Sequence, residues 1–332
     1  MYKIAQELIN SAQKIIIIQA ENPDGDSLGS ALALEELLCN IGKNIILYCP
    51  VEIPKYMRYI TGWDRVVNQF DTSFDLAIIV DTRADILLTK ILETPGVRHF
   101  LESHPVLCID HHLTDSNLSF DHTALCEEAV ATSEIIYELA NYCKWSINQS
   151  CAENLLTAIY SDSLGLTVQN VSPRTFFIAG KLTELGASSS NIEKRRREYM
   201  KKSAEILKYK GVLIERIEYF LDGKLALIRI PWDEIKKYSD QYNPSVLVLD
   251  EMRLVEGVDI GIAIKTYPDG KLTGKLRSNL PISATIAGFF GGGGHDYAAG
   301  FRIYESIDTI LPQLIDASDK ALKGYLNDIK IS

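Results

Sequence analysis

The chain has 332 residues, 46% of them hydrophobic, and a net charge of −10. This composition is typical of a globular protein with a large core, and the length favours two domains over one. The acidic balance argues against broad binding of long duplex nucleic acid. Six cysteines without CxxC spacing favour reduced thiols in a cytoplasmic protein. Because no apolar run approaches the roughly 18 residues of a membrane span, we expect no membrane partner.

Short β-branched runs alternate with longer amphipathic runs in the first half of the chain. The runs at 15–18, 44–48, 76–80 and 106–109 read as strands, and ALALEELLCN reads as a helix. This alternation predicts an α/β domain whose parallel sheet has helices on both faces. Ligands of such sheets bind beyond the carboxyl ends of the strands. Three of the runs end in acidic residues there, within IIIIQAENPDGD, LAIIVDTRAD and VLCIDHH.

A seven-residue apolar repeat marks the middle of the chain. Ile192, Tyr199, Ile206 and Leu213 predict one amphipathic linker helix. Between 193 and 210 this segment carries eight Lys or Arg against three Glu. That basic run is interpreted either as a solvated helix face or as a contact for phosphates.

The last third predicts a smaller α+β domain. A strand is expected at 224–230, a helix near 244–255, and a hairpin in VDIGIAIKTYPDGKLTGKLRSN that turns at Pro268 to Gly270. We therefore expect a metal-binding domain at 1–190, a helical linker at 191–214 and a substrate-binding domain at 215–332.

Acidic and histidine residues gather at the predicted ends of strands and helices. Singly, each reads as a turn or N-cap residue. Carboxylates brought together at one sheet edge repel, and cations make such an arrangement tolerable. Oxygen ligands with one or two imidazoles suit Mn²⁺ or Mg²⁺. The residues are Asp24, Asp26, Asp81, Asp110, His111, His112 and Asp162.

The D-x-D spacing of Asp24 and Asp26 adds a geometric argument. Residues i and i+2 of an extended segment point the same way, so each carboxylate can face a different metal ion of a pair. Two ions about 4 Å apart activate a water and clamp a phosphoryl group. Phosphoryl hydrolysis is therefore the leading reaction.

The phrase IDHH, together with NPDGDSLGS, VDTRAD, YSDSLG and GGGGHDYAAGF, resembles the DHH superfamily of metallophosphoesterases that carry a C-terminal DHHA1 domain. The motifs occur in the family's order and span nearly the whole chain. Within that superfamily, the chain resembles the oligoribonuclease and pAp phosphatase proteins of the NrnA type. The resemblance implies two Mn²⁺ ions in the first domain, substrate contacts in the second, and a homodimer.

The resemblance also implies roles for the clustered residues. Asp24 would bind the first ion, Asp26 the second, and Asp81 both. His111 and Asp162 would complete the second site. Asp110 and His112 would act beside the ions, orienting His111 and stabilising charge at the scissile phosphate. Ser30 would place a hydroxyl near phosphate, or simply cap the helix.

The glycine run GFFGGGGHDYAAG, at 288–300, reads either as a flexible loop or as a cradle of backbone N–H groups for an anion. The resemblance places substrate contacts here. It also matches Arg277 and Ser278 to the family's arginine-serine pair, and arginine holds phosphate with two parallel hydrogen bonds. The implied substrate residues of the run are Gly291, Gly292, Gly293, Gly294 and His295.

One position departs from the family pattern. Counting back from Pro23, the motif's histidine falls on Ala20, which cannot bind a metal. The first site would then keep Asp24 and Asp81, and Glu21 substitutes only if the chain turns there. Arg83 reaches the substrate or lies on the surface, and Thr132 reads as a helix-start residue.

Two functions follow. The first is a metal-dependent phosphoesterase that uses a metal-activated water to cleave short oligoribonucleotides, pAp or dinucleotides. The alternative is a catalytically weakened nucleotide-binding protein, because the motif's histidine is absent at Ala20.

Overall fold

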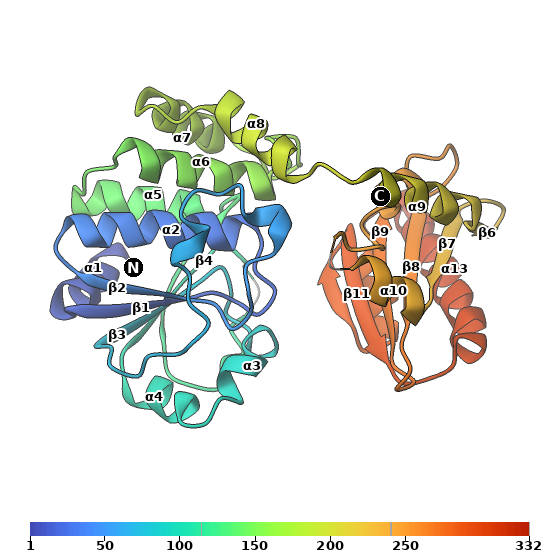
Figure 1. Ribbon diagram of the computed structural model, residues 1–332, viewed down its shortest axis with the longest axis horizontal. Coiled ribbons are helices and arrows are strands. Elements are labelled where there is room, and N and C mark those ends of the chain that lie inside the picture. Colours follow the sequence, from blue (N-terminus) through green and yellow to red (C-terminus); the bar gives the residue numbers. More distant parts are fainter. Residues whose placement is uncertain (114, 240, 332) are drawn as a thin grey trace. The chain divides into compact units, whose positions relative to one another are not determined.

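Five parallel strands form the first sheet, in the order β2-β1-β3-β4-β5 (Figure 1). The computed structural model describes residues 1–113, 115–239 and 241–331. The predicted parallel sheet is confirmed; its fifth strand was not expected, since β5 is short and mostly half-buried and lacks a long apolar run. The strands are β1 (Lys14–Ile18), β2 (Asn44–Tyr48), β3 (Leu76–Val80), β4 (Val106–Asp110) and β5 (Thr123–Cys126).

Helices cover both faces of this sheet. Because side chains alternate along a strand, Ile15 and Ile17 pack with α1, α2, α5 and α6, whereas Ile16 and Ile18 pack with α3 and α4. No helix of the described residues is both long and apolar enough to span a membrane. The helices are α1 (Tyr2–Ser11), α2 (Gly25–Asn40), η1 (Lys55–Met57), η2 (Trp63–Arg65), η3 (Asp85–Leu87), α3 (Thr89–Leu92), α4 (Val97–Ser103), α5 (Thr132–Cys143), α6 (Gln149–Asp162), α7 (Pro173–Glu184) and α8 (Ser189–Tyr199).

Two glycines let α2 and α6 approach closely. A Cβ on Gly29 would lie 2.8 Å from the carbonyl oxygen of Asn154 and 3.0 Å from the Cβ of Ala158. One on Gly25 would lie 2.4 Å from the Oγ of Ser161. Since a side chain at either position would push the helices apart, the two glycines hold the start of α2 against the end of α6.

The chain divides into two compact units, Met1–Lys201 and Lys202–Ser332. The second unit has a six-stranded sheet in the order β10-β11-β9-β8-β7-β6, antiparallel except for the β7–β8 pair. The expected hairpin is confirmed as β8–β9. The elements are α9 (Ala204–Glu215), β6 (Glu218–Phe220), β7 (Leu225–Ile230), α10 (Trp232–Tyr238), α11 (Leu249–Met252), β8 (Ile260–Thr266), β9 (Leu272–Ser278), α12 (Ser283–Phe289), β10 (Gly293–His295), β11 (Ala298–Ile303) and α13 (Ile307–Ile331).

The two faces of the second sheet differ. One face is apolar and packs against α12 and α13. On the other face, β7 and Ala263 of β8 pack with α9, α10 and α11.

Two predicted helices have other boundaries in the structure. The linker forms α8 and α9 instead of one helix, because Met200 ends α8 and the side chain of Ser203 caps the first turn of α9 at Ile206 N. The boundary between the two units falls between these helices. The helix expected near 244–255 is reduced to α11.

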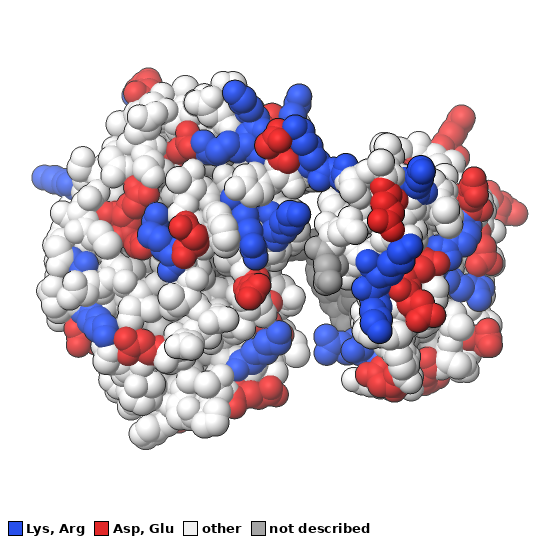
Figure 2. Space-filling view, viewed as in Figure 1, with Lys and Arg blue, Asp and Glu red and all other residues white. Residues whose placement is uncertain are grey.

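Basic side chains gather over α8 with acidic ones among them (Figure 2). Arg196 and Arg197 pair with Glu193 in the same helix, and Arg195 reaches Glu153 at 2.5 Å. The α8 part of the basic run is therefore largely neutralised by its own neighbours, which favours the solvated-face interpretation.

Replacing Gly29 with valine should lower the free energy of unfolding of the first unit by about 2 kcal/mol, because the new side chain meets backbone of α6. Urea unfolding followed by circular dichroism measures the change. Gly180, in α7, faces open space. Its replacement by alanine should instead stabilise the unit by about 0.5–1 kcal/mol through helix propensity. Equal effects at the two positions would contradict the close α2–α6 contact.

Candidate functional site

The carboxyl ends of the strands bring the predicted acidic residues together. Asp110 ends β4, and Asp81 follows β3 with a φ of +64°, a left-handed conformation that turns the chain sharply. Asp24 is the N-cap of α2, and Asp26 lies in that helix's first turn. Asp162 is the last residue of α6, which the glycine contacts hold close to the start of α2.

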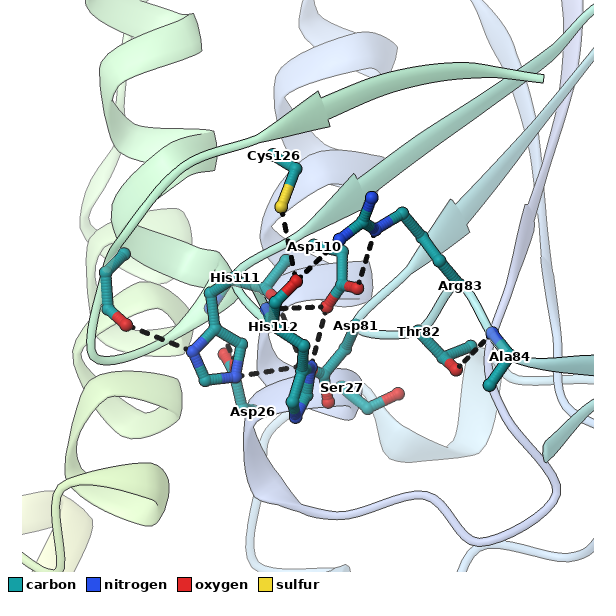
Figure 3. A network of polar contacts seen from close by, with 12 residues as sticks. Asp26, Ser27, Asp81, Thr82, Arg83, Ala84, Asp110, His111, His112 and Cys126 are labelled. Carbon is teal, nitrogen blue, oxygen red and sulfur yellow. Dashed lines mark hydrogen bonds and ion pairs between the residues drawn. The ribbon is translucent and has the colours of Figure 1, made fainter. Parts of the chain in front are cut away.

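His111 lies at the centre of the cluster (Figure 3). Its Nδ1 is 3.1 Å from the carbonyl oxygen of Ala129, which only accepts hydrogen bonds, so Nδ1 carries a proton. Nε2 therefore faces the carboxylates. It lies 3.3 Å from Asp162, 3.5 Å from Asp81 and 3.9 Å from Asp26, yet it makes no hydrogen bond with a described residue.

Burial and mutual repulsion shift the acidity of this group. Burial, then the charge of Asp162, raises the pKa of Asp26 to about 7. Burial and the neighbouring carboxylates likewise raise the pKa of Asp81 well above its usual value. Burial alone would lower the pKa of His111, but Asp162 and Asp26 raise it to about 9. Without a cation, these groups retain protons that ordinary aspartates release.

The N-terminus of α5 offsets part of the negative charge. The backbone N–H of Thr132 donates to Asp26 at 2.7 Å, and that of Ser133 donates to the same carboxylate at 3.3 Å. The Thr132 hydroxyl donates to Asp81 at 3.0 Å. A helix N-terminus favours anions, so α5 holds both carboxylates in place.

The expected phosphate contact of Ser30 is not supported. Ser30 is fully buried, lies beyond the first turn of α2, and donates to Asp26 at 2.9 Å. Because Ser30 is fully buried, its hydroxyl orients the Asp26 carboxylate and does not face a ligand.

Asp110 and His112 form a pair at the edge of the cluster. The Oδ1 of Asp110 lies 2.7 Å from the Nδ1 of His112, and its Oδ2 accepts from Arg83 at 3.1 Å. Burial would raise the pKa of Asp110, but His112 and Arg83 lower it, so this carboxylate stays charged. Arg83 also donates to the carbonyl oxygen of His112. Arg83 is largely buried and anchors the loop after β4 instead of lying on the surface.

The donor set fits a divalent cation. An imidazole lone pair aimed at three carboxylate oxygens is repulsive unless a proton or a metal ion lies between them. Two overlapping groups have ligand atoms within 4.8 Å of one another, and His111 belongs to both. The groups are Asp26, His111 and Asp162, and Asp81, His111 and His112.

The first predicted metal site has few ligands, because no side chain near Ala20 replaces the missing histidine. Asp24 uses one oxygen to accept from Ser27 N at 2.9 Å and belongs to neither group of the described residues. Ala20 is buried. The carboxylate of Glu21 accepts from Lys90 N at the start of α3, so this side chain does not replace a histidine.

In the second unit, Ser278 makes hydrogen bonds within the fold. It is fully buried, and its Oγ lies 2.6 Å from the carbonyl oxygen of Leu280 and 2.7 Å from the Oγ of Ser283. These contacts join the end of β9 to the start of α12, so the expected substrate contact is not supported. Arg277 is partly exposed and donates to its neighbour's carbonyl oxygen at 3.0 Å.

The glycine run is neither a loop nor a complete anion cradle. Gly291 and Gly292 donate their N–H groups to Gly288 and Ala287 and close the end of α12, with Gly291 at φ +70°. Gly293 and Gly294 then form the edge strand β10. The side chain of His295 lies outside the described residues.

Three contacts could not be predicted from the sequence. The Ala129 carbonyl, the N–H groups of α5 and the anchoring role of Arg83 depend on tertiary positions, although TSE at 132–134 does mark a helix start. The Gly25–Gly29 spacing was the available signal for the close α2–α6 contact.

Comparisons with known proteins agree with this geometry. Residues 14–161 match the DHH family, N-terminal domain. The bifunctional oligoribonuclease and PAP phosphatase NrnA of Mycoplasma genitalium is 27% identical, and the match covers 88% of this chain and 89% of that protein.

Two solved structures share the fold. An exopolyphosphatase-related protein from Bacteroides fragilis has a TM-score of 0.81 at 22% identity, covering 99% of this chain and 97% of that one. RecJ in complex with Mn²⁺ from Thermus thermophilus has a TM-score of 0.55 at 14% identity, covering 97% and 54%. Residues 14–161 thus match the DHH family, N-terminal domain, and over 88% of its length the chain is similar to a protein named as an oligoribonuclease and PAP phosphatase of the NrnA type.

Proposed function

We propose that the protein is a metal-dependent phosphoesterase that hydrolyses short oligoribonucleotides, pAp or dinucleotides. The observation that carries the proposal is the Nε2 of His111, 3.3–3.9 Å from oxygens of three carboxylates, of which Asp26 is fully buried. A cation centre of this composition suits phosphoryl transfer. The related NrnA protein is named for oligoribonuclease and PAP phosphatase activity, which supports the substrate class.

Mn²⁺ or Mg²⁺ fits the oxygen-rich donor set, with Asp26, Asp81, His111 and Asp162 as the proposed ligands. Such an ion, when bound, activates water and polarises the phosphoryl group. The Ala129 carbonyl keeps the proton of His111 on Nδ1, so that Nε2 is the ligand atom. Asp24 and Asp81 would hold the first ion of the pair, at the site that Ala20 leaves without a histidine.

The Asp110–His112 pair is assigned to the substrate side of the reaction. Asp110 fixes the orientation of the His112 ring, and Arg83 keeps Asp110 charged. A positively polarised His112 would then stabilise negative charge that develops on the phosphate. This assignment makes Asp110 a positioning residue and His112 the catalytic one.

The compartment is also part of the proposal. The six cysteines are free thiols, which suits a reducing, cytoplasmic setting. Short nucleotides, which carry fewer phosphates than long nucleic acid, are also the partners that a chain with a net charge of −10 tolerates best.

Hydrolysis of a labelled diribonucleotide and of pAp in Mn²⁺ tests the function. Asp81→Asn should reduce kcat by at least about 100-fold, because it removes a ligand charge from the centre. The same variant should raise the unfolding temperature in EDTA, since it relieves repulsion among buried carboxylates. Asp121→Asn changes an exposed carboxylate of the same unit and should alter neither property. Wild-type protein without turnover at high Mn²⁺ would refute the phosphoesterase.

Metal binding should strengthen as pH rises. Asp26 has a folded-state pKa of about 7 against a usual value of 3.8, so the metal-free folded state binds more protons than the unfolded state between these values. The contribution of Asp26 to metal-free stability therefore falls as pH rises through this window. Mn²⁺ must displace these protons, and the rise in unfolding temperature that it causes should grow from pH 5.5 to pH 7.5. A constant rise would argue against the cluster as the ligand set.

Ala20 favours a second candidate, a weakened enzyme that mainly binds nucleotides. His111 offers one ligand atom to two overlapping groups, so the described residues complete one metal site better than two. Metal analysis after gel filtration should give about one tightly held Mn²⁺ per chain. Ala20→His should raise both this ratio and kcat, whereas Ala20→Val, a control for added bulk, should raise neither. An unchanged ratio in Ala20→His would show that the position does not limit metal binding.

A further inference from the structure

One face of the second sheet carries a ladder of cations, here called the cationic face: Lys265 of β8, Lys275 and Arg277 of β9, and Arg302 of β11. The strand register places them on one side. Arg277 lies opposite Gly261 and Ala298, Lys275 opposite Ala263 and Gly300, and Thr273 opposite Lys265 and Arg302. Alternate residues of a strand are about 6.7 Å apart, so the cations form successive rows at that interval.

Small residues keep the cationic face low on the β11 side of Lys275, whereas on the β8 side Gly261 and Ala263 are covered by α11. Lys275 is flanked by Ala263 and Gly300, and the next residue of its row is Gly293. A Cβ on Gly293 would meet nothing within 4 Å, so this end of the row is open. Lys275 and Arg302 are exposed. A ligand can therefore lie across the row and reach the ammonium of Lys275.

Lys265 is the least ordinary member of the ladder. It is 9% exposed, and its Nζ donates to the neutral Oδ1 of Asn243 at 2.7 Å. Burial, then the charge of Lys275, lowers the pKa of Lys265 to about 8. Cations that repel one another attract an added anion strongly.

Carboxylates contribute little to this face. The described residues give neither Lys265 nor Lys275 an ion pair with an acidic side chain. The negative charge of Asp250 interacts with Arg277, but Asp250 also forms an ion pair with Arg253 at 3.3 Å. The unbalanced positive charge of this face therefore lies at Lys265 and Lys275, away from Asp250.

We propose that the cationic face binds successive phosphates of one single-stranded oligonucleotide, with Lys275 contacting a phosphate beyond the one at Arg277. The row interval is of the same order as the spacing of phosphates along an extended strand, and the low floor leaves room for the backbone. This inference rests on the proposed function for the identity of the ligand. It adds that chains with several phosphates are preferred over dinucleotides.

Binding provides the first test. The dissociation constant of a fluorescein-labelled pentaribonucleotide is measured by anisotropy in EDTA, which prevents cleavage, at several salt concentrations. Lys275→Met keeps the length of the side chain and removes one phosphate contact, so the slope of log K against log salt should fall by about 0.7. Lys320→Met removes an exposed charge from α13, on the opposite side of the sheet, and should leave the slope unchanged. Equal slopes for Lys275→Met and wild type would overturn the inference.

Activity provides the second test. Lys275→Met should lower kcat/KM for the pentaribonucleotide about tenfold, the loss expected for about 1.4 kcal/mol of phosphate contact. For a diribonucleotide, the change should be less than twofold. An equal loss on both substrates would contradict contacts with additional phosphates. If wild type cleaves neither substrate, the proposed function fails, while the slope in EDTA still decides whether the cationic face binds the strand. Thermal unfolding of each variant checks that it is folded.

Discussion

Repulsion among buried carboxylates around one imidazole nitrogen is the constraint on which the first unit depends. Asp26 and Asp81 are almost removed from water, and burial together with the charges of neighbouring carboxylates raises the pKa of each. An apolar core of the same volume would stabilise the fold more. The cluster therefore costs stability until protons or cations neutralise it. Such a cost in stability is typical of a functional site. Because the carboxylates repel one another, nearby groups must hold them in place.

The fold supplies this rigidity from three directions. The parallel sheet delivers Asp81 and Asp110 at the ends of adjacent strands. The N-terminus of α5 donates backbone N–H groups to Asp26. The glycines of α2 bring that helix against α6 and thereby bring Asp26 toward Asp162. Each direction fixes one or two carboxylates, and together they fix the distances between the carboxylate oxygens and the Nε2 of His111.

The sequence predicted the elements of the first sheet that contain long apolar runs, and it predicted the residues at their ends. It predicted less where a contact depends on distant backbone. Ser30 reads as a helix-start serine, yet its hydroxyl serves Asp26 because both lie on the buried face of α2. Gly291 reads as part of an anion cradle, yet its positive φ closes α12. A motif records which residues are present, whereas their hydrogen-bond partners are decided by packing.

The two units bear opposite local charges that the net charge of −10 conceals. The carboxylate cluster requires cations, and the cationic face requires anions. Binding energy gathered at phosphates remote from the reacting bond lowers the barrier only if it also fixes the position of that bond. For a short strand, each additional phosphate on the cationic face limits how the strand slides. The number of cation rows on the cationic face would then determine which strand length is cleaved most efficiently.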